Sequence, residues 1–108
     1  MAVLHLPKWN ISIGDDQPLV CIAGLNVLED IGLTLETARH LQAVTAELGM
    51  PFIFKASFDK ANRSSIRSFR GPGLAEGLKM LAEVKALVNV PIATDLHEID
   101  QAEPVAAV

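Results

Sequence analysis

Hydrophobic residues change their spacing several times along the chain, and each change predicts a different element. Near the amino terminus, two short alternating segments, AVLHL and NISI, are separated by Pro7 and followed by turn-forming residues at 14–18. Alternation is typical of strands, so residues 1–17 are predicted to form an N-terminal hairpin. Residues 19–25 are apolar without alternation, which predicts a strand buried on both faces.

Residues 33–48 have the spacing of a helix. One face of that helix carries mostly apolar side chains: Ala38, Leu41, Val44 or Thr45, and Leu48. Gly49 and Pro51 predict the end of the helix. A second short apolar run, residues 52–54, then predicts another strand.

A longer helical stripe occupies residues 74–88, and Asn89 is a suitable C-terminal cap. The stripe consists of Leu74, Leu78, Leu81, Val84 and Val88. Residues 91–95 predict a third strand, with proline tolerated at its first position. Residues 100–103, DQAE, have the form of a capping box and predict the start of a third helix.

The predicted order is a hairpin followed by three strand–helix units. Such alternation is typical of a parallel sheet with right-handed crossovers, either an open doubly wound sheet or part of a (β/α)8 TIM barrel. A full barrel takes roughly 250 residues, whereas this chain has 108. We therefore expect residues 18–108 to be the first three units of a larger α/β fold, in one partial domain.

Composition narrows the class of protein. Half of the residues are hydrophobic and the net charge is −4, which indicates a globular chain and argues against non-specific nucleic-acid binding. The one cysteine, Cys21, cannot form an intrachain disulfide and stands in an apolar run typical of a core position. No apolar run approaches the ~20 residues of a membrane span and no signal-peptide pattern is present, so a cytoplasmic protein is expected.

Polar residues close each of the three predicted strands. Asn26 follows the first strand, Lys55 and Ser57 follow the second, and Asp95 ends the third with His97 close behind. Ligands bind at the carboxyl ends of parallel strands. These side chains are therefore predicted to share one binding site at that edge of the sheet, which we call the mouth.

The segment from Lys55 to Arg70 adds positive charge to that mouth. It holds five of the chain's nine Lys and Arg residues and a single acid, Asp59. Arginine beside hydroxyl and amide donors, as in the run Asn62, Arg63, Ser64 and Ser65, is a suitable donor set for phosphate. The segment is thus predicted to bind anions, the alternative being a solvated basic loop; no His or Cys pair has metal-ligand spacing.

Three stretches carry a family resemblance. FKASFDKANRSSIRSFRGPGLAEGLK (residues 54–79), AGLNVLED (23–30) and ATDLHE (93–98) resemble, in the same order, the 3-deoxy-D-manno-octulosonate 8-phosphate synthase family. The resemblance implies a TIM-barrel transferase, usually a homotetramer. It would condense phosphoenolpyruvate with D-arabinose 5-phosphate and release phosphate, for lipopolysaccharide biosynthesis. The KANRSS segment disfavours the sister synthase that uses erythrose 4-phosphate, in which a KPRTS-like segment is typical.

The resemblance also implies roles for single residues. Lys55 and Ser57 would contact phosphoenolpyruvate, Lys60 would lie between the two substrates, and Asp95 would bind hydroxyls of the sugar. The sugar phosphate would be held by three residues of the loop: Asn62, Arg63 and Ser64. Lys60 and Asn26 are the catalytic candidates.

Asn26 also bears on cofactors. Members of the family that need a divalent metal have a cysteine at this position, and members with asparagine need none. An amide is a poorer ligand than a thiolate for such an ion, so no metal or other cofactor is expected.

The family's remaining strands carry further residues of the site that this chain does not contain, so 108 residues alone are not expected to catalyse. Two alternatives stay open: the seven-carbon sister synthase, and an inactive anion-binding barrel fragment.

Overall fold

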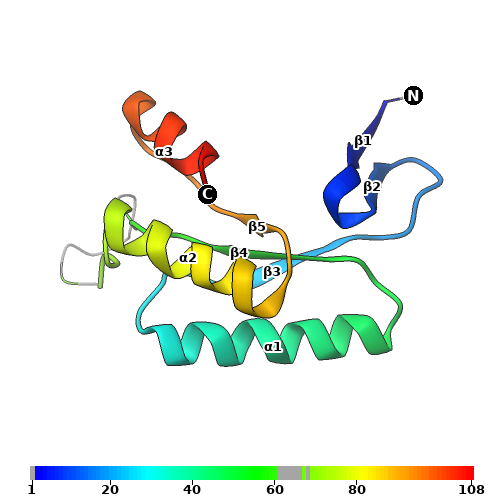
Figure 1. The fold of residues 1–108 in the computed structure, drawn as a ribbon, viewed down its shortest axis with the longest axis horizontal. Coiled ribbons are helices and arrows are strands. Elements are labelled where there is room, and N and C mark those ends of the chain that lie inside the picture. The colour runs from blue at the N-terminus through cyan, green and yellow to red at the C-terminus, as the bar shows by residue number, and fades with distance from the viewer. Residues whose placement is uncertain (1, 61–66, 68) are drawn as a thin grey trace.

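The computed structural model describes residues 2–60, 67 and 69–108, and Figure 1 shows the arrangement of the elements. An N-terminal hairpin precedes three parallel strands and their helices. In chain order the elements are β1 Val3–Leu6, the 3₁₀ turn η1 Pro7–Trp9, β2 Ile11–Gly14, β3 Cys21–Leu25, α1 Ile31–Glu47, β4 Phe52–Ala56, α2 Leu74–Val88, β5 Ile92–Ala93, the 3₁₀ turn η2 Ile99–Gln101 and α3 Ala102–Ala106.

The central sheet is parallel and has the strand order β3-β4-β5. Gly24 of β3 pairs with Lys55 of β4, which pairs in turn with Ala93 of β5. The predicted parallel sheet is therefore confirmed, and the described residues form an open sheet rather than a closed barrel. Helices α1 and α2 pack on the same face of this sheet (Figure 1).

The predicted hairpin is also present. β1 and β2 are antiparallel, and Val3 pairs with Gly14. Between them Pro7 starts the η1 turn, as its fixed φ allows, and Asn10 ends it in the left-handed conformation. The sequence break at Pro7 is thus the point where the chain reverses.

The core lies between the sheet and the two long helices. Phe54 and Phe58 are fully buried, together with Leu81 and Val84 from α2. The contact is close at Gly77, where an added Cβ would lie 2.3 Å from Cβ of Phe58. Most of the predicted α2 stripe is buried. Asn89 is the C-terminal cap, as predicted, and takes the left-handed conformation.

The prediction that the first strand is buried on both faces is wrong. Ile22 is 58% exposed and Leu19, which precedes β3, is 76% exposed. Ala23 and Leu25 face the helices and pack against the core. Along the described chain, no element covers the side of β3 that carries Ile22, so apolar sequence here does not produce burial.

The buried face of α1 agrees with the prediction at Ala38 and, of the alternatives Val44 and Thr45, at Thr45. Leu48 is predicted on the same face but is 68% exposed, because it follows the last helical residue. Thr34 is buried as well, and the hydroxyls of Thr34 and Thr45 each donate to a backbone carbonyl one turn earlier. A threonine that satisfies its hydroxyl in this way can take a core position.

The third unit is shorter than predicted. β5 covers only Ile92–Ala93, because Thr94 and Asp95 leave the ladder. The capping box was placed at residues 100–103, whereas the structure forms it between Glu98 and Gln101 at the start of η2.

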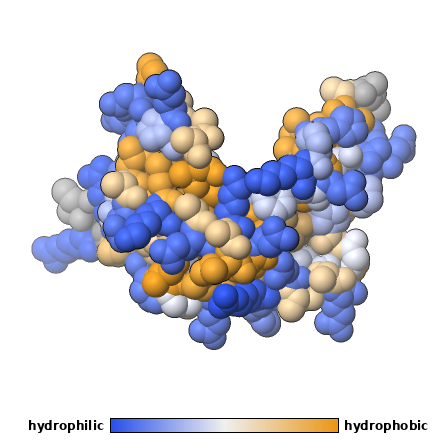
Figure 2. All heavy atoms as spheres, viewed as in Figure 1, coloured by the Kyte–Doolittle hydropathy of each residue, from blue (hydrophilic) through white to orange (hydrophobic). Residues whose placement is uncertain are grey.

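The hairpin and α3 project from the other face of the sheet, at opposite ends (Figure 1). A groove of about 370 Å³ lies between them, with the side chains of Leu6 and Trp9 on one side and Val105 on the other. Figure 2 shows hydrophobic surface on the sides of this hollow. Among the described helices, none combines the length and hydrophobicity that a membrane span requires.

Candidate functional site

The carboxyl ends of β4 and β5 bring three predicted site residues together. Asp95 lies two residues after Ala93, and Ser57 two residues after Lys55, so the parallel register places Ser57 and Asp95 side by side. The Ser57 hydroxyl donates to Oδ1 of Asp95 at 2.6 Å and accepts from Nζ of Lys55 at 3.2 Å. Nζ of Lys55 is itself 3.6 Å from Oδ1 of Asp95. The shared mouth is thus confirmed for these three side chains.

Exposure separates the roles of the three groups. Ser57 is fully buried, whereas the side chains of Lys55 and Asp95 are 35% and 38% exposed. The ammonium and the carboxylate can therefore meet a ligand. The buried Ser57 hydroxyl is hydrogen-bonded to both of them.

Asp95 is held in its ionised form. Burial opposes ionisation, but the hydrogen bond from Ser57, a backbone hydrogen bond and the nearby charges of Lys55 and His97 outweigh it. The pKa of Asp95 is therefore lowered below its ordinary value. At neutral pH this side chain is an acceptor only.

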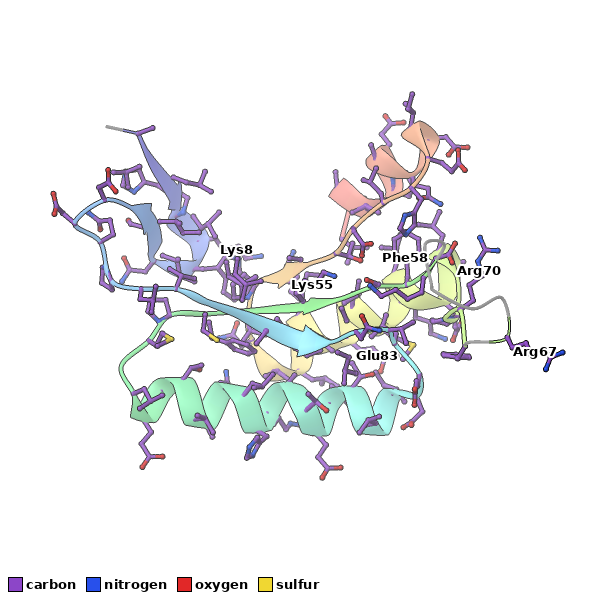
Figure 3. The ribbon with its side chains drawn as sticks, turned by 180° about the vertical axis from the view of Figure 1, so that it is seen from behind. Lys8, Lys55, Phe58, Arg67, Arg70 and Glu83 are labelled. Carbon is purple, nitrogen blue, oxygen red and sulfur yellow. The ribbon has the colours of Figure 1, made fainter. Side chains whose placement is uncertain are left out.

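The two ends of the long β4–α2 connection are hydrogen-bonded to each other and form the base of this loop. The backbone N–H of Lys60 donates to the carbonyl of Arg70 at 2.6 Å, and that of Gly73 donates to the carbonyl of Phe58 at 3.0 Å. Nε and Nη2 of Arg70 also bind the two carboxylate oxygens of Asp59, at 2.6 and 3.2 Å. Figure 3 shows Arg70 beside this base and Arg67 pointing away from it.

His97 connects this base to β5. Its Nε2 lies 2.7 Å from the carbonyl oxygen of Asp59 and 3.6 Å from Oδ2 of Asp95. A carbonyl can only accept, so Nε2 carries the proton. The ring also packs edge-on against Phe58, with 6.1 Å between ring centroids.

For the remaining predicted site residues, the structure describes Asn26 and Lys60. Asn26 is exposed just after β3, on the strand that neighbours β4. Lys60 is half-buried, at the start of the loop. Asn62, Arg63 and Ser64 lie outside the described residues.

The neighbour of Lys55 on β3 is a glycine for a steric reason. A Cβ at Gly24 would lie 1.9 Å from the carbonyl oxygen of Lys55. The two backbones could not keep this spacing with any side chain at position 24. The close approach therefore leaves the space beside Lys55 without a side chain from β3.

Sequence reasoning left Arg70 without a role and did not connect it with Asp59. The available signal was the position of the two opposite charges at the ends of a loop that finishes in Gly71-Pro72-Gly73. Within residues 2–60, 67 and 69–108, no group of three or more His, Cys, Asp or Glu could hold a metal ion. Metal independence itself remains a prediction from Asn26.

Comparison with known proteins adds independent information. Residues 2–108 match the model of the DAHP synthetase I family. The chain is 55% identical over all 108 residues to the 2-dehydro-3-deoxyphosphooctonate aldolase of Colwellia psychrerythraea, covering 39% of that protein. It is 56% identical over 108 residues to the Hahella chejuensis protein of the same name, covering 38% of it. With the Bordetella pertussis protein of that name the identity is 59% over 96 residues, or 89% of this chain and 34% of that one. The chain thus spans less than two fifths of the length of these relatives.

Proposed function

Since the chain belongs to the DAHP synthetase I family, we propose that it carries part of the active site of a 3-deoxy-D-manno-octulosonate 8-phosphate synthase. This enzyme condenses phosphoenolpyruvate with D-arabinose 5-phosphate and releases inorganic phosphate, a step towards lipopolysaccharide. The names of the relatives favour the eight-carbon product over the seven-carbon one. The observation that carries the proposal is the contact of Lys55, Ser57 and Asp95 at the carboxyl ends of two parallel strands.

The proposal includes the architecture and the assembly. Three parallel strands with α1 and α2 on one face and polar site residues on the other have the arrangement of the first units of a TIM barrel. In such a barrel the face that carries Ile22 and Lys55 would be the interior. The homotetramer that the family resemblance implies, and a cytoplasmic location, belong to the same proposal.

Lys55 and Asp95 suit opposite features of the two substrates. The Lys55 ammonium has three protons and uses one on Ser57, so further protons can bind a carboxylate or phosphate of phosphoenolpyruvate. The ionised Asp95 can accept hydrogen bonds from hydroxyls of the sugar. Together they would hold an anion and a polyol next to each other, which is most of what this condensation needs.

Lys60 is proposed to lie between the substrates and to stabilise the negative charge that changes position during the reaction. Ser57 is proposed to orient Lys55 and Asp95; a direct bond to phosphoenolpyruvate would need its hydroxyl to leave Asp95. The sugar phosphate is assigned to the loop residues Asn62, Arg63 and Ser64.

A chimera tests this function. The 108 residues of this chain would replace the matching 38% of the Hahella chejuensis relative, and phosphate release would be measured with each sugar phosphate. Activity is expected with arabinose 5-phosphate and not with erythrose 4-phosphate. Lys60→Ala is expected to lower kcat by about a hundredfold through lost charge stabilisation, whereas Lys79→Ala, an exposed change on α2, leaves it unchanged.

Other outcomes of the assay decide between the alternatives. Activity with erythrose 4-phosphate would indicate the sister synthase. A folded chimera that is active with neither sugar would support an anion-binding module without catalysis.

We also propose that the site works without a metal, because Asn26 stands where a metal-dependent relative has cysteine. Prolonged treatment of the chimera with a chelator is expected to leave kcat unchanged. Loss of activity that returns on adding a divalent metal contradicts this.

A further inference from the structure

Asp59 is the residue at which three parts of the molecule meet. Its carboxylate accepts two hydrogen bonds from Arg70, at the far end of the loop. Its carbonyl oxygen lies 2.7 Å from Nε2 of His97, which follows β5. The residue before it, Phe58, is fully buried in the core.

These contacts restrain the residue that follows. The Lys60 N–H donates to the carbonyl of Arg70, so the side chain and the backbone of Arg70 bind two consecutive residues. The Asp59 side chain is only 19% exposed. The backbone that carries the Lys60 side chain is therefore fixed by the core on one side and by Arg70 and His97 on the other.

We propose that Asp59 is a positioning residue for anion binding: by holding Arg70 and His97, it fixes the backbone from which Lys60 reaches the mouth. The identity of the anions rests on the proposed function. The restraint on Lys60 rests only on the contacts around Asp59.

The direction in which anion affinity changes when Asp59 is removed distinguishes positioning from a purely electrostatic effect. A carboxylate near an anion site repels the anion. If Asp59 acted only through its charge, its removal would tighten anion binding. If it positions Lys60, its removal weakens anion binding even though the site becomes more positive.

The test compares Asp59→Ala with Asp100→Ala in the 108-residue chain. Both changes remove one negative charge beyond the carboxyl end of the sheet, and Asp100 is exposed in η2. Arg70→Gln is compared with Arg39→Gln, an exposed change on α1. Two quantities are measured by NMR: the hydrogen-exchange rate of the Lys60 amide and the dissociation constant of phosphoenolpyruvate.

Asp59→Ala and Arg70→Gln are expected to speed exchange at Lys60 by about fivefold, the order expected for loss of a surface ion pair. Each is expected to weaken phosphoenolpyruvate binding by about threefold or more. The two control variants should change neither quantity beyond about twofold. The double variant Asp59→Arg with Arg70→Asp should recover part of both losses.

Two outcomes overturn the proposal. The first is an unchanged exchange rate of the Lys60 amide in Asp59→Ala. The second is a faster exchange rate in Asp59→Ala while its dissociation constant for phosphoenolpyruvate equals that of Asp100→Ala. If the unsubstituted chain binds no phosphoenolpyruvate, exchange at Lys60 alone decides on the restraint, and the chimera assay decides on the proposed function. The amides of Leu81 and Val84 report unfolding; if Asp59→Ala unfolds, Arg70→Gln breaks the same pair from its exposed side.

Discussion

Replacing Ser57 by alanine would remove the hydroxyl that connects Lys55 to Asp95 while leaving a side chain of similar size. In the structure this hydroxyl is buried and makes a 2.6 Å bond to the Asp95 carboxylate and a 3.2 Å bond from the Lys55 ammonium. A hydrogen bond to a charged group contributes about 1.5–3 kcal/mol. Asp95 is 38% exposed and 3.6 Å from Lys55, so water and a closer ion pair would offset part of the loss. We expect Ser57→Ala to lower the free energy of unfolding by about 1–2 kcal/mol near neutral pH.

This loss should depend on pH. The pKa of Asp95 is lowered in the folded chain, so its ionised form stabilises the fold above the unfolded pKa of about 3.9. That contribution disappears as the pH falls through the folded pKa and the carboxylate is protonated. The difference between the unsubstituted chain and Ser57→Ala should therefore shrink in acid, and the pKa of Asp95 should rise in the variant.

Urea unfolding of both proteins at several pH values measures the difference, and carboxyl NMR follows Asp95 directly. Ser12→Ala is the matched control, because the Ser12 hydroxyl lies 2.9 Å from the exposed ring of His5 in the hairpin. A loss within about 0.5 kcal/mol is expected there. The reasoning is refuted if Ser57→Ala costs the same at every pH, or if the pKa of Asp95 does not change.

Two further predictions concern the scaffold of the site. Gly77→Ala places a Cβ 2.3 Å from Phe58 and should lower the free energy of unfolding by about 1–3 kcal/mol. Gly32→Ala in α1, whose Cβ would lie 3.2 Å from Oδ1 of Asp30, should change it by no more than about 0.5 kcal/mol; equal effects of the two in urea unfolding contradict this. Asp30→Ala removes the cap that accepts the Leu33 N–H at 2.8 Å and should cost about 1 kcal/mol, and an unchanged unfolding midpoint would argue against the cap.

The strands, helices and mouth could be predicted because they follow from local patterns and one general rule. Hydrophobic spacing separates strands from helices, and the carboxyl ends of parallel strands meet at one edge. That rule predicts from the sequence alone that Lys55, Ser57 and Asp95 lie together. It did not show that the Ser57 hydroxyl would be buried between the other two.

What could not be predicted depends on which surfaces meet. An apolar run shows that Ile22 prefers burial, but not whether another element covers it. The Asp59–Arg70 contact depends on how a long loop returns to its own start, which no local pattern specifies. Predicting the capping box two residues too late had a similar cause, because both 98–101 and 100–103 offer a polar pair at capping-box spacing.

The sequence of the loop has one acid and five bases. The ion pairs that its residues form change the charge available to a ligand. Asp95, distant in sequence, lies beside Lys55, and Asp59 binds Arg70. Lys55 and Arg70 therefore already have acidic partners. A site of bases alone would attract any anion, whereas Lys55 beside an ionised Asp95 offers a donor and an acceptor together. That pairing favours a ligand set with both an anionic group and hydroxyls, because a simple anion would satisfy Lys55 and be repelled by Asp95.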